Sequence, residues 1–110
     1  MATLFKNKLR SSIGTTEVTV LSTASNAKTT VIGLSLANLT ESIVLADIVL
    51  SDTVEGTSAH YVKEVVVPPN QSLRVVNGGE KLLLGPSTDI KIKANIDASL
   101  DLVLSYVEIV

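Results

Sequence analysis

The chain has no cysteine, no tryptophan and a single histidine. Without cysteine it can form neither disulfides nor thiolate metal sites. Aromatic residues make up only 3% of the sequence, so the aromatic platforms on which sugars usually stack are scarce. Charged residues account for 18% and the net charge is −2, which gives no electrostatic case for binding nucleic acid. These absences argue against a disulfide scaffold, a nucleic-acid-binding protein and, less strongly, a carbohydrate-binding module.

Long apolar runs are also absent, because the longest is only a few residues and a membrane span needs about 20. The opening MATLFKNKLRSS lacks the apolar segment of a secretory signal peptide. The composition that remains is aliphatic, with 45% hydrophobic residues and a mean hydropathy of +0.41. Val and Ile favour pleated, half-buried surfaces. We therefore expect one β-rich domain in these 110 residues, without contact with a membrane.

Strand-like segments alternate with turn signals at short intervals, which is typical of an all-β fold. We predict an antiparallel β-sandwich of about eight strands, jelly-roll-like or immunoglobulin-like, without helices. The predicted strands are 4–9, 17–21, 29–38, 43–50, 60–67, 73–76, 81–84, 89–94 and 99–109. Residues 1–14 form an N-terminal arm or first strand, and residues 15–110 form the β-sandwich domain.

Alternation within the strands predicts which side chains face the core. In strand 89–94 the apolar face carries Ile90, Ile92 and Ala94, while the opposite face is charged. Strand 43–50 points Val44, Ala46, Ile48 and Leu50 inward by the same rule, and strand 29–38 points Ile32, Leu34 and Leu36 to one face. Asn77-Gly78-Gly79 lies between two strand-like runs and predicts a hairpin that pairs them.

The last strand is apolar on both faces. Its sequence, SLDLVLSYVEI, places one set of apolar side chains on each side of the backbone. One face carries Leu100, Leu102, Leu104 and Tyr106, and the other carries Val103, Val107 and Ile109. A strand in a sheet with one solvated face would leave one of these sets polar. We therefore predict that this strand is covered on both faces, either inside the sandwich or by a second subunit.

The N-terminal segment has a basic alternation and an apolar one. Lys6, Lys8 and Arg10 share one side, and Phe5, Asn7 and Leu9 share the other. One interpretation is a first strand that packs Phe5 and Leu9 into the core. The other is an arm that pairs with a neighbouring subunit and presents its basic face to an acidic surface. The candidate interface with another subunit or a shell consists of Leu4, Phe5, Lys6, Lys8, Leu9, Arg10, Val103, Val107 and Ile109.

No group of residues has the pattern of a catalytic or metal site. His60 is the only histidine, and no partner for it can be identified from the sequence. Asp47, Asp52 and Glu55 lie near one loop, but they lack the spacing of a calcium-binding loop. We expect no enzymatic activity, no cofactor and no metal.

Two segments match the acceptor pattern for N-glycosylation, Asn38-Leu39-Thr40 and Asn70-Gln71-Ser72. The pattern is short enough to arise by chance in a chain rich in Ser and Thr. Both segments also fit ordinary turns, which is the interpretation we prefer.

The turns and strands after residue 65 resemble small structural proteins of tailed bacteriophages, particularly of marine and cyanobacterial phages. The resemblance is carried by Pro68-Pro69-Asn70, by the GGEKL segment, by GPSTD and by the final LSYVEI strand. The opening LFKNKL, followed by Ile13-Gly14-Thr15, fits the same pattern. The resemblance covers most of the chain, and its motifs are turns and strands rather than a reactive site.

The resemblance implies a non-enzymatic virion protein that works as a homo-oligomer, with a trimer as one plausible arrangement. We expect a capsid decoration or cement protein that stabilises the head shell by contacting the major capsid protein or other virion proteins. Its location would be the phage particle, assembled in the host cytoplasm. The alternatives are a neck, collar or tail attachment subunit and a receptor- or glycan-binding β-sandwich module.

Overall fold

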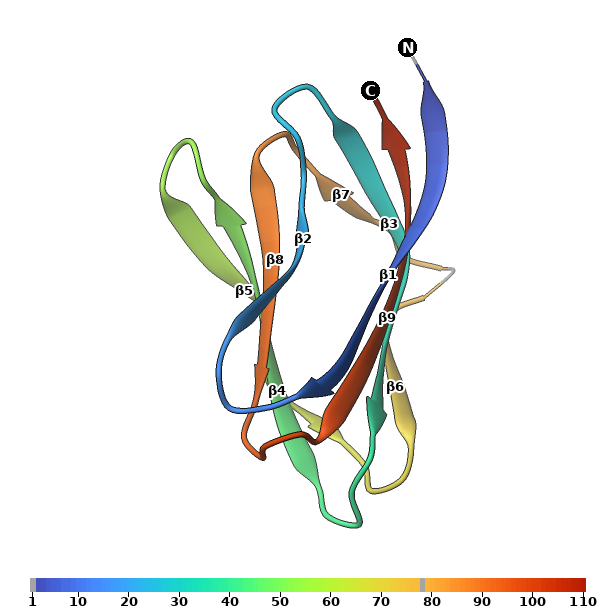
Figure 1. Ribbon diagram of the computed structural model, residues 1–110, viewed down its shortest axis with the longest axis vertical. Coiled ribbons are helices and arrows are strands. Elements are labelled where there is room, and N and C mark those ends of the chain that lie inside the picture. Colours follow the sequence, from blue (N-terminus) through green and yellow to red (C-terminus); the bar gives the residue numbers. More distant parts are fainter. Residues whose placement is uncertain (1, 78) are drawn as a thin grey trace.

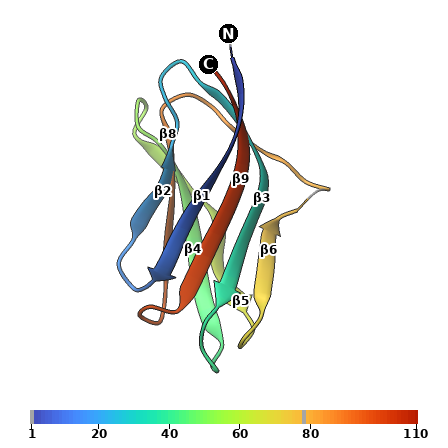
Figure 2. The ribbon, with the colours of Figure 1, turned by 45° about the vertical axis from the view of Figure 1, so that its right-hand side comes forward.

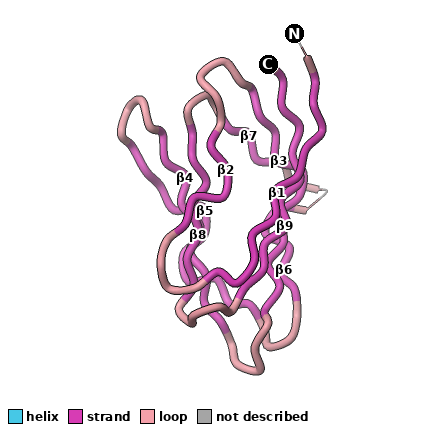
Figure 3. The backbone as a smooth tube through the Cα atoms, viewed as in Figure 1, coloured by secondary structure: helices cyan, strands magenta, loops and turns pink. Residues whose placement is uncertain are grey.

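The computed structural model describes residues 2–77 and 79–110. This part of the chain forms nine strands and no helix (Figure 3). The strands are β1 (Thr3–Ile13), β2 (Val18–Ser22), β3 (Lys28–Asn38), β4 (Val44–Asp52), β5 (Thr57–Val67), β6 (Ser72–Val76), β7 (Leu82–Leu84), β8 (Thr88–Ala94) and β9 (Leu100–Ile109). The predicted all-β fold is confirmed.

The strands form two antiparallel sheets that pack face to face (Figures 1 and 2). One sheet has the order β1-β9-β3-β6, with β7 also paired to β3, and the other has the order β2-β8-β4-β5. The pairs are nested along the chain, because β1 pairs with β9, β2 with β8, β3 with β6 and β7, and β4 with β5. The chain is thus one long antiparallel hairpin folded over itself, which is the jelly-roll arrangement.

The core lies between the two sheets and is almost entirely aliphatic. Leu34 and Leu36 on β3 meet Ile48 on β4 and Ile90 and Ile92 on β8, and all five are buried. The inward faces predicted for β8 and β4 are confirmed, with Leu50 half-buried at the margin of the core. Interiors of this kind need few aromatic residues because branched aliphatic side chains fill the space between two pleated sheets.

Strand β3 contains a bulge that changes which side chains face the core. The register with β9 shifts between Val31 and Gly33, so Val31 and Leu34 are both buried while Ile32 is exposed. The prediction that Ile32 shares one face with Leu34 and Leu36 is therefore wrong. An extra residue in one strand reverses the alternation beyond it, and nothing in the alternation itself marks the position.

The hairpin predicted at Asn77-Gly78-Gly79 is also wrong, although Gly78 itself lies outside the described residues. Strands β6 and β7 do not pair with each other. β6 pairs with residues 34–37 of β3, and β7 pairs with residues 29–31 of the same strand. The two strands are successive parts of one edge of the sheet (Figure 1).

The two ends of the described chain are joined. Ala2 and Val110 exchange backbone hydrogen bonds of 2.8 and 3.0 Å, which extends the pairing of β1 with β9 to the last residue. β1 runs in register with β9 from Thr3 to Arg10, and the register shifts before Ile13, near Ser12 with a φ of 54°. The division of the chain into an arm of residues 1–14 and a domain of residues 15–110 stays a prediction, and Met1 lies outside the described residues.

Candidate assembly surface

Strand β9 lies in the middle of its sheet, between β1 and β3 (Figure 2). Its inner side chains, Leu100, Leu102, Leu104 and Tyr106, are buried against the second sheet. On the outer side Val103 is 45% exposed, and Val107 and Ile109 are half-buried. The sandwich thus covers only one face of this strand. The prediction that both faces are covered is wrong for the chain alone, and the outer apolar set is left uncovered.

The apolar side chains of β1 lie on the same outer face. Phe5 is paired with Val107 and Leu9 with Val103, so each side chain lies beside an apolar side chain of β9. Phe5 is 80% exposed and Leu9 is 69% exposed. The interpretation that packs these two side chains into the core is therefore wrong, because β1 is an edge strand and the outer face of its sheet has no covering layer.

This outer face of β1, β9 and β3 is defined here as the apolar face. On these three strands its charged side chains are Lys28 at one end of β3 and Asp101 at the opposite end of β9, as follows from the alternation and the paired registers. Arg74 of the neighbouring strand β6 lies opposite Ser35 at the border of the face, and the polar pair Asn7 and Ser105 lies within it. Two residues of the apolar face were not among the predicted interface residues. Ile32 reaches the face through the bulge. Leu83 on β7 is 75% exposed and lies opposite Thr30 of β3. The bulge and the split edge strand depend on tertiary pairing, so no local signal marked either residue.

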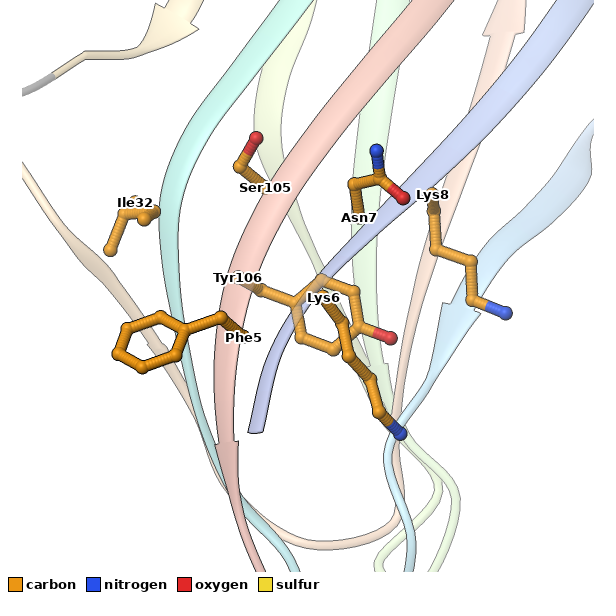
Figure 4. Close-up of a pocket in the computed structure, with 7 residues that line it drawn as sticks. All are labelled: Phe5, Lys6, Asn7, Lys8, Ile32, Ser105 and Tyr106. Atoms are coloured by element: carbon orange, nitrogen blue, oxygen red, sulfur yellow. The ribbon is translucent and has the colours of Figure 1, made fainter. Parts of the chain in front are cut away.

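The basic residues of β1 lie on the other side of the strand. Figure 4 shows Phe5 and Ile32 pointing to one side of the sheet and Lys6 and Lys8 to the other. Lys6 Nζ lies 2.9 Å from Glu108 Oε1, and the hydrogen bond and attraction to that carboxylate raise the pKa of Lys6. Leu4 and Arg10 share this side by alternation. Of the nine predicted interface residues, five thus lie on the apolar face and four on the basic side.

Two shallow hollows lie beside β1. One, of about 670 Å³, is lined by residues of β1, β3 and β9 that include Phe5, Ile32 and Ser105 (Figure 4). The other, of about 380 Å³, lies between Lys6 and Lys8 of β1 and residues 19–22 of β2, where the edges of the two sheets diverge. Neither is an enclosed cavity, and among the described residues the one hydrogen bond between side chains that line them joins Lys6 to Glu108. Their shape suits contact with another macromolecule better than capture of a small substrate.

The other candidate residues are exposed or hydrogen-bonded to the backbone. His60 is exposed on β5. Asp47 accepts a hydrogen bond from the backbone N–H of Glu64 at 2.6 Å, and Asp52 accepts two from the turn that follows β4. Within residues 2–77 and 79–110 no three His, Cys, Asp or Glu residues lie close enough together to hold a metal ion. In the same ranges no helix has the length and apolar character of a membrane span.

The two glycosylation-like segments differ in accessibility. Asn38 is 4% exposed, and its Nδ2 donates to the carbonyl oxygens of Ser42 and Val67. Its side-chain amide is thus occupied inside the fold, in agreement with the turn interpretation. Asn70 is exposed and adopts a φ of 54°, a conformation that asparagine tolerates in turns.

The loop between β4 and β5 and the loop between β7 and β8 come together at one end of the sandwich, where a receptor- or glycan-binding module would carry its site. Thr53 donates to the carbonyl oxygen of Ser87 through both its N–H and its Oγ1, at 2.9 and 2.8 Å. A hollow of about 420 Å³ lies between the two loops, lined by Ser25, Asp52, Val54, Glu55 and residues 85–88. None of these side chains is aromatic, so the hollow offers no ring on which a sugar could stack.

Comparison with known proteins supports the fold. Neither a model of a protein family nor a curated protein matches the chain. Among solved structures, the chain matches one from Bacillus endospore appendages, described as disulfide-linked pili, with a TM-score of 0.57 and 12% identity. That match covers 96% of this chain and 86% of the other. A chain from the Gt strain of infectious bursal disease virus matches with a TM-score of 0.53 and 11% identity, covering 97% of this chain and 32% of the viral one. At such low identity these matches show a shared fold.

Proposed function

We propose that this protein is a non-enzymatic structural subunit of a virus particle, and specifically a decoration or cement protein on the head of a tailed bacteriophage. The observation that carries the proposal is the apolar face. It spans three neighbouring strands, includes Phe5 and Leu9 at 80% and 69% exposure, and carries charge only at its margins, where Arg74 of β6 borders it. Exposed apolar side chains gathered on one face, with few charges among them, are typical of a protein interface.

The size of the apolar face suits such a role. Three strands spaced about 4.8 Å apart and about ten residues long cover roughly 480 Å² in projection. A stable protein interface buries about 800 Å² on each partner. The face can therefore supply most of one interface, and burial of each large apolar side chain contributes about 1.5–3 kcal/mol. A flat surface of this area is suited to lie against a shell or against neighbouring copies in a cyclic trimer.

The comparisons support an assembly protein without specifying its place. One matched chain comes from a pilus and the other from a virus. The resemblance of the turns and strands to tailed-phage structural proteins favours the virion over the filament. The present chain also has no cysteine, so the disulfide linkage described for the pili is not available to it.

A neck, collar or tail attachment subunit is the alternative within the same class. It would use the same apolar face, because burial of apolar surface does not depend on where in the particle the partner lies. Electron microscopy of particles carrying a label on this chain separates the two, since a decoration protein labels the head and an attachment subunit labels the neck or tail.

The test compares two substitutions that are matched in residue type and exposure. Val103 lies on the apolar face and is 45% exposed, whereas Val66 lies on β5 in the other sheet and is 50% exposed. We expect Val103→Lys to weaken oligomerisation and particle binding by about tenfold or more, because a lysine would be desolvated in the interface. Val66→Lys should behave like the wild type.

Light scattering after size exclusion measures the oligomeric state at micromolar concentration. Co-sedimentation with particles assembled without this chain measures binding to the shell. A wild-type protein that stays monomeric and does not bind particles would refute the proposed function. Equal losses in the two variants would show that the apolar face has no special role.

A further inference from the structure

We propose that the free edge of β1 binds an extended acidic segment of a neighbouring protein as an added antiparallel β-strand. The inference deepens the proposed function by specifying the chemistry of one partner, and it rests on that function only in treating the partner as part of the same assembly. It concerns the edge of the sheet and the basic side of β1, whereas the proposed function concerns the apolar face.

The backbone of β1 has hydrogen-bonding groups available along this edge. Ala2 and Val110 exchange both of their backbone hydrogen bonds, so they form a hydrogen-bonded pair. Hydrogen-bonded and non-hydrogen-bonded pairs alternate along two antiparallel strands. Every second residue of β1 from Leu4 to Arg10 therefore bonds to β9. The N–H and C=O groups of Phe5, Asn7 and Leu9 point away from β9, and in the described part of the chain β1 pairs with no other strand.

This edge is also regular enough to accept another strand. From Thr3 to Arg10 the register with β9 continues without a shift. The edge at β5 differs, because a register shift and a φ of 51° at Glu64 interrupt it and Pro68 follows it. Bulges and prolines block the addition of strands to an edge. The edge at β1 has neither over this stretch.

The side chains of β1 specify an acidic partner. In an added antiparallel strand, residues opposite Phe5, Asn7 and Leu9 would exchange hydrogen bonds with them. Residues opposite Lys8 and Arg10 would then occupy the non-hydrogen-bonded pairs, in which side chains approach most closely. Lys6 is already bound to Glu108, whereas no carboxylate lies within ion-pair distance of Lys8 or Arg10 among the described residues. Acidic residues at alternate positions of the partner would pair with these two cations.

A second copy of β1 is a poor occupant of the same edge. In the centred antiparallel register Lys8 would lie opposite Lys8 of the other copy, and Lys6 opposite Arg10. A shift by two residues in either direction would place Lys6 against Lys8 or Lys8 against Arg10. Like charges directly opposite each other destabilise a strand pair. Charge complementarity therefore selects an acidic segment of another chain.

The test uses two acetylated peptides of nine residues, one alternating Glu with Val and one alternating Lys with Val. Fluorescence anisotropy at low salt measures their binding to the full chain. We expect the Glu peptide to bind about tenfold more tightly, because two opposed pairs change from attraction to repulsion. The double variant Lys8→Glu, Arg10→Glu should reverse this preference.

A proline substitution tests the role of the edge itself. Asn7→Pro removes an N–H that points away from β9, so it leaves the pairing of β1 with β9 intact while blocking an added strand. We expect binding of the Glu peptide to fall about tenfold or more, whereas Asn7→Thr should bind normally. Amide hydrogen exchange should show new protection at Phe5, Asn7 and Leu9 when the Glu peptide binds.

The inference is overturned if neither peptide binds, if both bind equally, or if the newly protected amides lie elsewhere. It can fail separately from the proposed function. The variant Val103→Lys should still bind the Glu peptide, because that substitution lies on the apolar face. If the peptide does not bind but Val103→Lys still prevents association with particles, the edge proposal alone is wrong.

Discussion

Replacement of Asn38 by alanine should destabilise the fold more than its position at the end of a strand suggests. The side chain is 4% exposed and makes four hydrogen bonds. Its Nδ2 donates to the carbonyl oxygens of Ser42 at 2.8 Å and Val67 at 3.0 Å. Its Oδ1 accepts from the N–H and Oγ1 of Thr40, both at 2.8 Å. One side chain thus joins the turn after β3 to the end of β5.

The expected loss follows from the burial of these partners. The hydrogen bond to Val67 is buried, and a buried polar group left without its partner costs about 1–3 kcal/mol. The other three bonds lie nearer the surface, where water can replace them in part, and together they add about 1 kcal/mol. We expect Asn38→Ala to lower the free energy of unfolding by about 2–4 kcal/mol. The melting temperature should fall by roughly 10–20 °C.

The variant Asn38→Asp keeps the hydrogen bonds that the side chain accepts and removes those that it donates. An aspartate still accepts from Thr40, but its carboxylate would face the carbonyl oxygens of Ser42 and Val67. That contact and burial should raise the pKa of the new carboxyl group in the folded state. Since a raised pKa favours the protonated folded protein, stability is lost as pH rises through the ordinary carboxyl range. Asn38→Asp should therefore be more stable in acid than at neutral pH, relative to the wild type.

Urea unfolding measures these effects, with Asn26→Ala as the control at an exposed turn asparagine. The control should change the free energy of unfolding by less than about 0.5 kcal/mol. The reasoning is refuted if Asn38→Ala costs less than about 1 kcal/mol, since that value would show that the buried bond to Val67 contributes little.

Three further predictions concern the stability of the sandwich. Thr29→Val should raise the free energy of unfolding by about 1 kcal/mol in urea titrations, because the buried Oγ1 of Thr29 has no hydrogen-bond partner in the described structure. Gly14→Ala should lower it by about 1–3 kcal/mol, because a Cβ there would lie 2.9 Å from Asp97 Oδ1 and 3.2 Å from a backbone nitrogen; an unchanged midpoint would contradict this. Hydrogen bonds from the N–H and Oγ1 of Thr15 lower the pKa of Asp97, so this group stabilises the fold above its ordinary pKa and the contribution is lost as pH falls. Asp97→Asn should therefore flatten the acid side of the stability profile, and a profile identical to the wild type would rule out this contribution.

Much of the fold follows from local patterns that the chain carries by itself. Strand β8 alternates aliphatic and charged residues, and its inner face is the predicted one. Strand β9 has its two apolar sets on opposite sides, as its alternation requires. These features can be read from the sequence because neighbouring side chains in a strand always point to opposite faces.

The candidate site was accessible to sequence analysis only in part. Alternation placed Phe5 and Leu9 together on one side of β1, opposite the lysines. It could not show whether that side meets the core or solvent, because this depends on where the second sheet lies. The outward position of Ile32 depends on a bulge, and that of Leu83 on pairing with β3.

The sequence by itself determined the strands, their two-faced character and the aliphatic nature of the core, since these depend on residue type and a period of two. Only the tertiary structure decided which strands are neighbours and which faces are covered. The Asn-Gly pair after β6 is a strong local signal for a hairpin, yet β6 and β7 both pair with β3. Pairing with β3 buries Val76 and Leu84 in the core, and pairing of strands distant in the chain is not encoded in any one segment.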